Sequence, residues 1–166
     1  MIFDFNEHKH RFAVWTAARS VQRSFTNNKN IKEAINFTSI KSFSESNEII
    51  SSDQFDELQK EWCKAIIKSL EEKNISCSYG RASKIITIYL KTSVILPNHG
   101  QGNKSQVIHP PIDRILLTNL SNNYHDLKSF NQKGWTNFEE NDYWNLIENL
   151  KKKFGSFDWR LEEYWN

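Results

Sequence analysis

The stretch that decides the fold runs from Gly80 to Leu96 and reads GRASKIITIYLKTSVIL. Its apolar residues surround the helix axis and do not form a stripe on one side; they are Ala82, Ile85, Ile86, Ile88, Tyr89, Leu90, Val94 and Ile95. A helix that is apolar all round is a buried helix. β-Branched residues also suit a strand, but the length of this segment favours a helix. We therefore expect a buried helix at the centre of the molecule.

Amphipathic patterns predict further helices before this segment. Ser51 and Gln54 form a capping-box pattern, and acidic residues follow in the first turn, where the helix dipole favours them. The expected elements are a helix from Glu7 to about Phe25, a short helix 31–37 that Asn30 caps, a polar loop 39–52, and a helix that ends at about Lys73.

The part of the chain after Leu96 also has helical patterns. Residues 97–106 contain two glycines and little apolar surface, so we expect an exposed loop. The expected helices after it are 109–120, which His109-Pro110-Pro111-Ile112-Asp113 opens, a helix from Thr136 to Gly155 with a capping box of Thr136 and Glu139, and a short helix 156–165. There is no internal repeat and no convincing strand pattern. The sequence thus predicts an all-α protein of about seven to eight helices.

Length and composition indicate one folded domain, residues 1–166. The chain has 38% hydrophobic and 13% aromatic residues. This apolar content is enough to bury a core, which excludes a disordered chain. No apolar run is long enough to cross a bilayer, and no charged-then-apolar leader pattern precedes the longest run, so we expect a cytoplasmic protein. The net charge of +2 is compatible with nucleic-acid binding but does not by itself indicate it.

Metals and cofactors are not expected. The chain has only two cysteines, Cys63 and Cys77, which excludes zinc ribbons, cysteine-ligated iron–sulfur clusters and a disulfide framework. His8 and His10 do not share a helix face, and no acidic partner lies nearby at the spacing of a zinc site.

Two segments carry a resemblance to a known family. Gly80-Arg81-Ala82-Ser83-Lys84 and Pro111-Ile112-Asp113-Arg114 are similar to motifs of the helix-hairpin-helix DNA glycosylases, the superfamily that includes 8-oxoguanine DNA glycosylase and endonuclease III. In that family a glycine-containing turn leads into a helix, and bifunctional members have the catalytic lysine at its start. A Pro-Val-Asp-like segment with the catalytic aspartate then opens the next helix. The resemblance covers Tyr79 to Leu120 and implies a glycosylase-like helical fold with catalytic Lys84 and Asp113.

The sequence departs from the family at two points. The family's hairpin reads close to Leu-Pro-Gly-Val-Gly, whereas residues 76–80 read SCSYG and lack the first glycine and the proline. The gap between Lys84 and Asp113 is longer than is usual in the family, and the excess corresponds to the loop 97–106.

The chemistry of base excision explains why a lysine and an aspartate should occur together. Cleavage of an N-glycosidic bond develops positive charge on the sugar, which a carboxylate such as Asp113 stabilises. A lysine on an apolar helix is desolvated, which lowers its pKa and frees the amine of Lys84 to form a Schiff base with the sugar. The sequence therefore predicts a DNA glycosylase, with Schiff-base lyase activity as an option, that acts in DNA repair or anti-phage defence.

The resemblance also suggests residues that contact DNA. An enzyme of this class flips its target base out of the duplex and holds it against an aromatic side chain. The candidates for base stacking are Trp15, Tyr79 and Trp135, and those for nucleic-acid binding are Arg11, Arg19, Arg23, Gly80, Arg81 and His109. The expected partner is double-stranded DNA, and the expected state is a monomer.

Simpler explanations exist for the same residues. Lys84 can be a residue whose amine reaches solvent at a helix end, and Asp113 an ordinary acid of a first helical turn. The arginines 11, 19 and 23 can form salt bridges on a solvated face, and His109 can cap a helix. Trp159 and Trp165 are expected to pack on the core.

The alternative function is a non-catalytic helical module that binds nucleic acid or protein and retains a glycosylase-like scaffold. A helical ribonuclease toxin is disfavoured, because no histidine follows Arg114 at the spacing of its Arg-then-His motif.

Overall fold

The computed structural model describes residues 2–21, 23–155 and 157–166, and these form helices and no strand, which confirms the all-α prediction. The eight α-helices are α1 (Phe5–Val21), α2 (Asn28–Asn36), α3 (Ile40–Glu45), α4 (Ser52–Glu71), α5 (Tyr79–Leu90), α6 (Arg114–Asn123), α7 (Lys128–Lys133) and α8 (Glu140–Phe154). Among the residues described, no helix is both long enough and apolar enough to cross a membrane.

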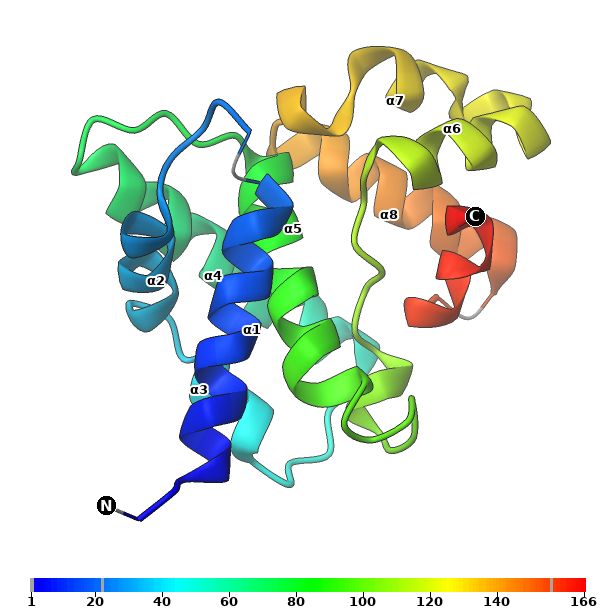
Figure 1. The fold of residues 1–166 in the computed structure, drawn as a ribbon. Coiled ribbons are helices and arrows are strands. Elements are labelled where there is room, and N and C mark those ends of the chain that lie inside the picture. The colour runs from blue at the N-terminus through cyan, green and yellow to red at the C-terminus, as the bar shows by residue number, and fades with distance from the viewer. Residues whose placement is uncertain (1, 22, 156) are drawn as a thin grey trace.

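Helix α5 is the buried helix that the sequence predicts. The side chain of Ser78 caps it by accepting a hydrogen bond from the amide of Arg81, and nearly every residue from Tyr79 to Leu90 is buried. Helices α1 and α4 pack against it, and Figure 1 shows α1 running alongside α5. The chain then continues into a π-helical turn, η1 (Lys91–Ile95), so the helical run ends close to the predicted Leu96.

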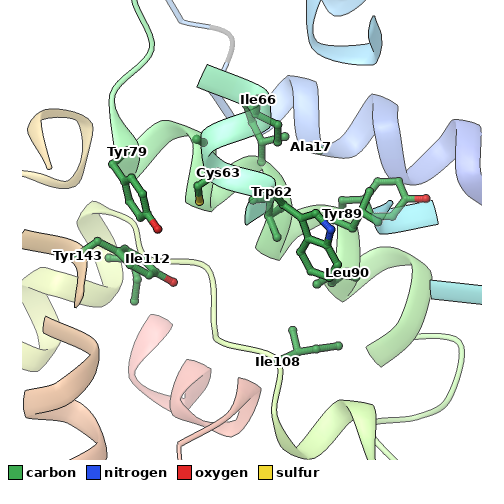
Figure 2. Close-up of a cluster of buried hydrophobic side chains, with 14 of the residues drawn as sticks. Ala17, Trp62, Cys63, Ile66, Tyr79, Tyr89, Leu90, Ile108, Ile112 and Tyr143 are labelled. Atoms are coloured by element: carbon green, nitrogen blue, oxygen red, sulfur yellow. The ribbon is translucent and has the colours of Figure 1, made fainter. Parts of the chain in front are cut away.

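The core forms where α5 meets its neighbours (Figure 2). Trp62 from α4 lies beside Tyr89 and Leu90 from α5, and Cys63 and Ile66 from α4 belong to the same buried cluster. The buried cluster also includes apolar residues from α1, α2, α6 and α8. The elements that carry Lys84 and Asp113 are thus anchored in one apolar core.

Three details differ from the predictions in the first third of the chain. The expected loop 39–52 contains α3, because Ile40 and Phe43 bury their side chains in the core. Asn27, and not Asn30, caps α2 by accepting a hydrogen bond from the amide of Asn30. Helix α1 ends at Val21, before the predicted Phe25. Gln22, within that predicted helix, lies outside the described residues.

The connection from α5 to α6 also differs from the prediction. The segment 97–106 is only partly exposed: Lys104 is buried, and its ammonium donates hydrogen bonds to the carbonyls of Phe43 and Ser46. Residues 107–112 are buried and non-helical, so the expected helix start at His109 is wrong. Helix α6 begins at Arg114, since Asp113 has extended backbone angles and is its N-cap.

The last third of the chain forms α7, a 3-10 turn η4 (Trp135–Asn137), α8 and a 3-10 helix η5 (Trp159–Trp165). Helix α8 ends at Gly155, as the sequence predicts, but its N-cap is Glu139 and not Thr136. Ser156, where a final helix was expected to begin, lies outside the described residues. Helix η5 packs against α6, and Figure 1 shows the C-terminal segment beside the yellow-green helix.

Candidate active site at the starts of α5 and α6

The first turn of α5 is held against η4 by Gly80. Its amide donates a hydrogen bond to the carbonyl of Phe138 at 3.2 Å. A Cβ added at Gly80 would overlap the carbonyl oxygen of Trp135, so only glycine allows this close approach. The contact places the indole of Trp135 beside Lys84, one turn further along α5.

Lys84 and Asp113 lie next to each other although a long connection separates them. Lys84 Nζ is 3.6 Å from Asp113 Oδ2, and their side chains are only 11% and 15% exposed. The same ammonium lies 4.4 Å from the centre of the Trp135 ring, a distance at which a cation is attracted to the π-face. The structure therefore brings three of the predicted site residues, Lys84, Asp113 and Trp135, into one cluster.

The Asp113 carboxylate is fixed by donors on both oxygens. Oδ1 accepts a hydrogen bond from the amide of Leu116 at 3.0 Å, which is the capping interaction of α6. Oδ2 accepts a hydrogen bond from the indole N–H of Trp165 at 2.9 Å. The carboxylate faces Lys84 in one defined orientation.

The surroundings of Lys84 favour the neutral amine more than water does. Burial lowers the pKa of Lys84, and the negative charge of Asp113 opposes this by attracting the ammonium. The net pKa lies below the ordinary value of a lysine. This is the direction that a nucleophilic amine requires.

An open groove adjoins the cluster. It has a volume of about 410 Å³, and Trp135 and Arg114, the neighbour of Asp113, belong to its walls. Thr118, Asn131 and Gln132 supply polar groups to the same groove. Trp135 is the residue that this groove shares with the cluster, and Lys84 and Asp113 are not among its lining residues.

The residues predicted on the first helix form a separate exposed face of α1. Trp15 is 50% exposed and stacks on Phe12 with ring centres 5.8 Å apart. The Arg19 guanidinium lies 5.9 Å from the centre of the Trp15 ring, and Arg11 pairs with Glu7 at 2.9 Å. Arg23 is also exposed, in the turn that follows α1. Arg11, Phe12, Trp15 and Arg19 share the outer face of α1, which we call the α1 face, and Arg23 follows the end of the helix.

Two other candidates, Tyr79 and Gly80, are buried, and a third, Arg81, is half-buried. Tyr79 is buried, with its hydroxyl accepting a hydrogen bond from the Trp144 indole at 2.8 Å, and Figure 2 shows its ring among core side chains. Gly80 is buried and its amide is already bonded, so neither residue is available to a base or a phosphate. Arg81 is half-buried, and its guanidinium lies 4.7 Å from the centre of the Phe25 ring.

His109 is completely buried and neither caps a helix nor faces solvent. Its Nε2 is 2.9 Å from Asp56 Oδ1 and its Nδ1 is 3.0 Å from the Tyr143 hydroxyl. Burial lowers the pKa of His109, although the hydrogen bond with Asp56 opposes the shift. In this position the ring cannot reach a phosphate, and it serves to join α4, α8 and the segment before Asp113.

Trp165 is the site residue that the sequence does not indicate. It was expected to pack on the core, but it is 45% exposed and bonded to Asp113. No local sequence pattern predicts the hydrogen bond between Trp165 and Asp113, because the two residues are 52 positions apart in the chain.

Comparisons with known proteins found no match: no family model fits the chain, and no curated protein or solved structure is significantly similar to it. Within the ranges that the structure describes, no three His, Cys, Asp or Glu side chains are placed to hold a metal ion. The functional argument therefore rests on the cluster around Lys84.

Proposed function

We propose that this protein is a DNA glycosylase with Schiff-base lyase activity that removes a modified or damaged base. The observation that carries the proposal is the 3.6 Å approach of Lys84 Nζ to Asp113 Oδ2. Lys84 lies in the second turn of α5 and Asp113 caps α6, in the order that the resemblance to helix-hairpin-helix glycosylases implies. An ordinary surface ion pair would not need a lysine on the most buried helix of the molecule.

The chemistry assigns one role to each group. The neutral amine of Lys84 attacks C1′ of the sugar, the N-glycosidic bond breaks, and the base leaves with the bonding electrons and takes up a proton. The nitrogen then loses a proton, the bond from C1′ to the ring oxygen opens as that oxygen is protonated, and an iminium between Lys84 and C1′ results. Asp113 remains ionised and stabilises the positive charge that develops on the sugar.

DNA binding would use two regions. A flipped nucleotide would enter the groove beside Trp135, whose ring offers a stacking surface, while Arg114 also lines the groove. The exposed arginines and Trp15 of the α1 face would contact phosphates and bases outside the groove. Because the arginines of this region would neutralise phosphates, we expect DNA affinity to fall as salt concentration rises.

The proposal is tested by trapping the Schiff base with borohydride. Wild-type protein would be incubated with duplexes that contain an abasic site or one of a panel of oxidised, alkylated, deaminated or hypermodified bases. We expect a covalent protein–DNA product and an abasic product with at least one substrate. Lys84→Gln should abolish trapping, and Asp113→Asn should slow it by roughly two orders of magnitude, the typical effect of losing one preorganised electrostatic group.

Lys91→Gln is the matched control for the lysine. Lys91 lies on the same helical run but pairs with Glu162 at 2.7 Å, so its replacement should leave trapping unchanged. A wild-type protein that gives neither a trapped complex nor an abasic product on any of these duplexes would refute the enzyme proposal.

One observation favours the alternative, a non-catalytic nucleic-acid-binding module. The stacked and exposed Phe12 and Trp15 on the α1 face form a surface that needs no chemistry at Lys84. For such a module, Lys84→Gln combined with Asp113→Asn would leave DNA binding and biological effect intact, whereas Trp15→Ala would weaken binding. The same pair of substitutions would eliminate the biological effect of an enzyme.

A further inference from the structure

The contact between Trp165 and Asp113 joins the C-terminal segment to the candidate site. The indole N–H of Trp165 donates to Asp113 Oδ2 at 2.9 Å, and this is the oxygen that lies 3.6 Å from Lys84 Nζ. A hydrogen-bonded ion pair between an ammonium and a carboxylate has an N–O distance of roughly 2.7–2.9 Å. Lys84 and Asp113 are therefore close but do not form a tight ion pair.

Helix α6 holds Trp165 in this position. The side-chain amide of Asn119 on α6 donates to the carbonyls of Tyr164 and Asn166, at 2.8 and 2.7 Å. The hydroxyl of Tyr164 forms a further hydrogen bond with Tyr124 at 2.9 Å. Since α6 is also the helix that Asp113 caps, Trp165 and Asp113 are fixed to the same element.

Burial alone does not explain the placement of the indole. Trp165 is 45% exposed, whereas a tryptophan held by packing would hide most of its surface. The indole nitrogen is a donor only, so it can contact the ionised carboxylate but cannot accept a proton from it. The geometry suits a residue that fixes a carboxylate in one orientation.

We propose that Trp165 is a positioning residue that holds Asp113 Oδ2 away from Lys84 and so prevents a tight ion pair. Without the indole N–H, Oδ2 would close on the ammonium and stabilise the protonated lysine. With it, the carboxylate keeps the orientation in which it stabilises a positively charged sugar, and the amine remains easier to deprotonate. The proposed role rests on the proposed function, because it assigns Trp165 to the same reaction.

The charged and titratable groups around Lys84 are few. Asp113, at the start of α6, is the group whose charge acts on Lys84, and η4 presents the uncharged ring of Trp135. A change in the titration of Lys84 on replacing Trp165 can therefore be attributed to Asp113.

The first test measures the titration of Lys84 directly and does not need enzymatic activity. Lysine ¹³C-labelled at Cε would be followed by NMR against pH, with the Lys84 signal assigned by its loss in Lys84→Gln. In Trp165→Phe, which keeps a ring but lacks the N–H, we expect the midpoint of Lys84 to move to higher pH. An unchanged midpoint, or a shift to lower pH, would overturn the proposal.

Trp159→Phe is the matched control. Trp159 lies in the same helix η5, but its indole nitrogen is buried and has no hydrogen-bond partner among the described residues, so its replacement removes no such bond. The Lys84 midpoint should stay at its wild-type value in this variant. If Trp165→Phe does not fold, Asn119→Ala provides a second route, because it releases the backbone on either side of Trp165 and should shift the midpoint in the same direction.

The second test measures the rate of Schiff-base trapping on abasic DNA as a function of pH. We expect Trp165→Phe to lower the rate near neutral pH roughly tenfold, the effect of one lost hydrogen bond to a charged group. Raising the pH should restore the rate, and DNA affinity should not change. A loss that is equal at all pH values would indicate a merely structural role and contradict the proposal. If the wild-type protein traps nothing, the enzyme proposal fails while the NMR titration still decides the role of Trp165.

Discussion

At Gly80 a missing side chain determines how two distant segments meet. The residue lies in the first turn of α5, where its amide bonds to the carbonyl of Phe138 and its Cα faces the carbonyl of Trp135. Glycine disfavours a helix because of its backbone freedom, so its presence here needs a compensating contact. The contact is the approach of η4, which supplies the ring beside Lys84.

Replacement of Gly80 by alanine should therefore destabilise the protein, although alanine is the better helix former. Helix propensity alone would give a gain of roughly 1 kcal/mol, whereas displacement of the Trp135 backbone should cost more, for a net loss of about 1–3 kcal/mol. Urea unfolding measures the difference. Gly155→Ala is the control: its added Cβ has open space, so it should cost only about 1 kcal/mol from its positive φ. A stabilised Gly80→Ala variant would contradict the structural explanation.

The side chains of the candidate site differ in how clearly the sequence indicates them. Lys84 stands out as a charge on the most apolar segment, and Asp113 follows a proline in a motif. The sequence alone therefore predicts both as site residues. It does not predict Trp165, because its contact depends on how η5 folds back on α6. The two prolines after His109 predict a helix start, and this prediction is wrong because the segment is non-helical and buried.

A capping-box pattern predicts the start of a helix only where tertiary packing leaves the flanking residues free to adopt the cap conformation. Ser51 and Gln54 form the predicted capping box, with reciprocal hydrogen bonds of 3.2 and 2.9 Å. Thr136 and Glu139 have the same spacing, but Thr136 belongs to the turn η4 and α8 begins at Glu140. Because η4 is held by its contact with α5, tertiary packing overrides the local pattern there.

This difference predicts unequal effects of two similar substitutions. Ser51→Ala should lower the free energy of unfolding by about 0.5–2 kcal/mol, the usual contribution of an N-cap side chain. Thr136→Ala should change it by less than about 0.5 kcal/mol, as expected for a surface substitution away from a cap. Thermal and urea unfolding of both variants would check this. Equal losses at the two positions would mean that Thr136 also caps a helix.

The elements themselves were predictable to different degrees. Helices α1, α4, α5 and α8 have long apolar patterns, and each was expected close to its observed position. The sequence predicts a loop in place of helix α3, because Ile40 and Phe43 are the two buried residues of α3 and the rest of the segment is polar. Short helices of this kind depend on the core that receives them, and a pattern of six residues does not contain that information.

At the scale of the whole molecule, a buried polar network links the elements around the site. His109 bonds Asp56 of α4 on one side and Tyr143 of α8 on the other. The Gln59 amide donates to the Tyr143 hydroxyl at 2.7 Å and lies 3.4 Å from the hydroxyl of Ser83, the neighbour of Lys84. The network thus runs from the segment before Asp113 to the helix of Lys84, and it fixes their relative position.

This network predicts a loss of stability in mild acid. The pKa of His109 is lower in the folded protein than the ordinary value of 6.5, because burial disfavours the charged ring. Above pH 6.5 neither state binds the proton, and stability is independent of this group. As the pH falls below 6.5, the unfolded chain is protonated first, so stability is lost by up to about 1.4 kcal/mol per pH unit until the folded-state pKa is reached.

Urea unfolding between pH 7.5 and 5.5, a range set above the titration of carboxylates at roughly pH 4, would measure this dependence. His109→Asn should lower stability at every pH but should weaken its pH dependence, since the titrating ring is gone while the ion pair between Asp56 and Lys151 remains. His10, whose pKa is also lowered by burial, would account for part of the slope that persists. The exposed His125 is the control, and His125→Gln should keep the wild-type slope. An unchanged slope in His109→Asn would contradict this prediction, because it would mean that the buried ring does not couple folding to pH.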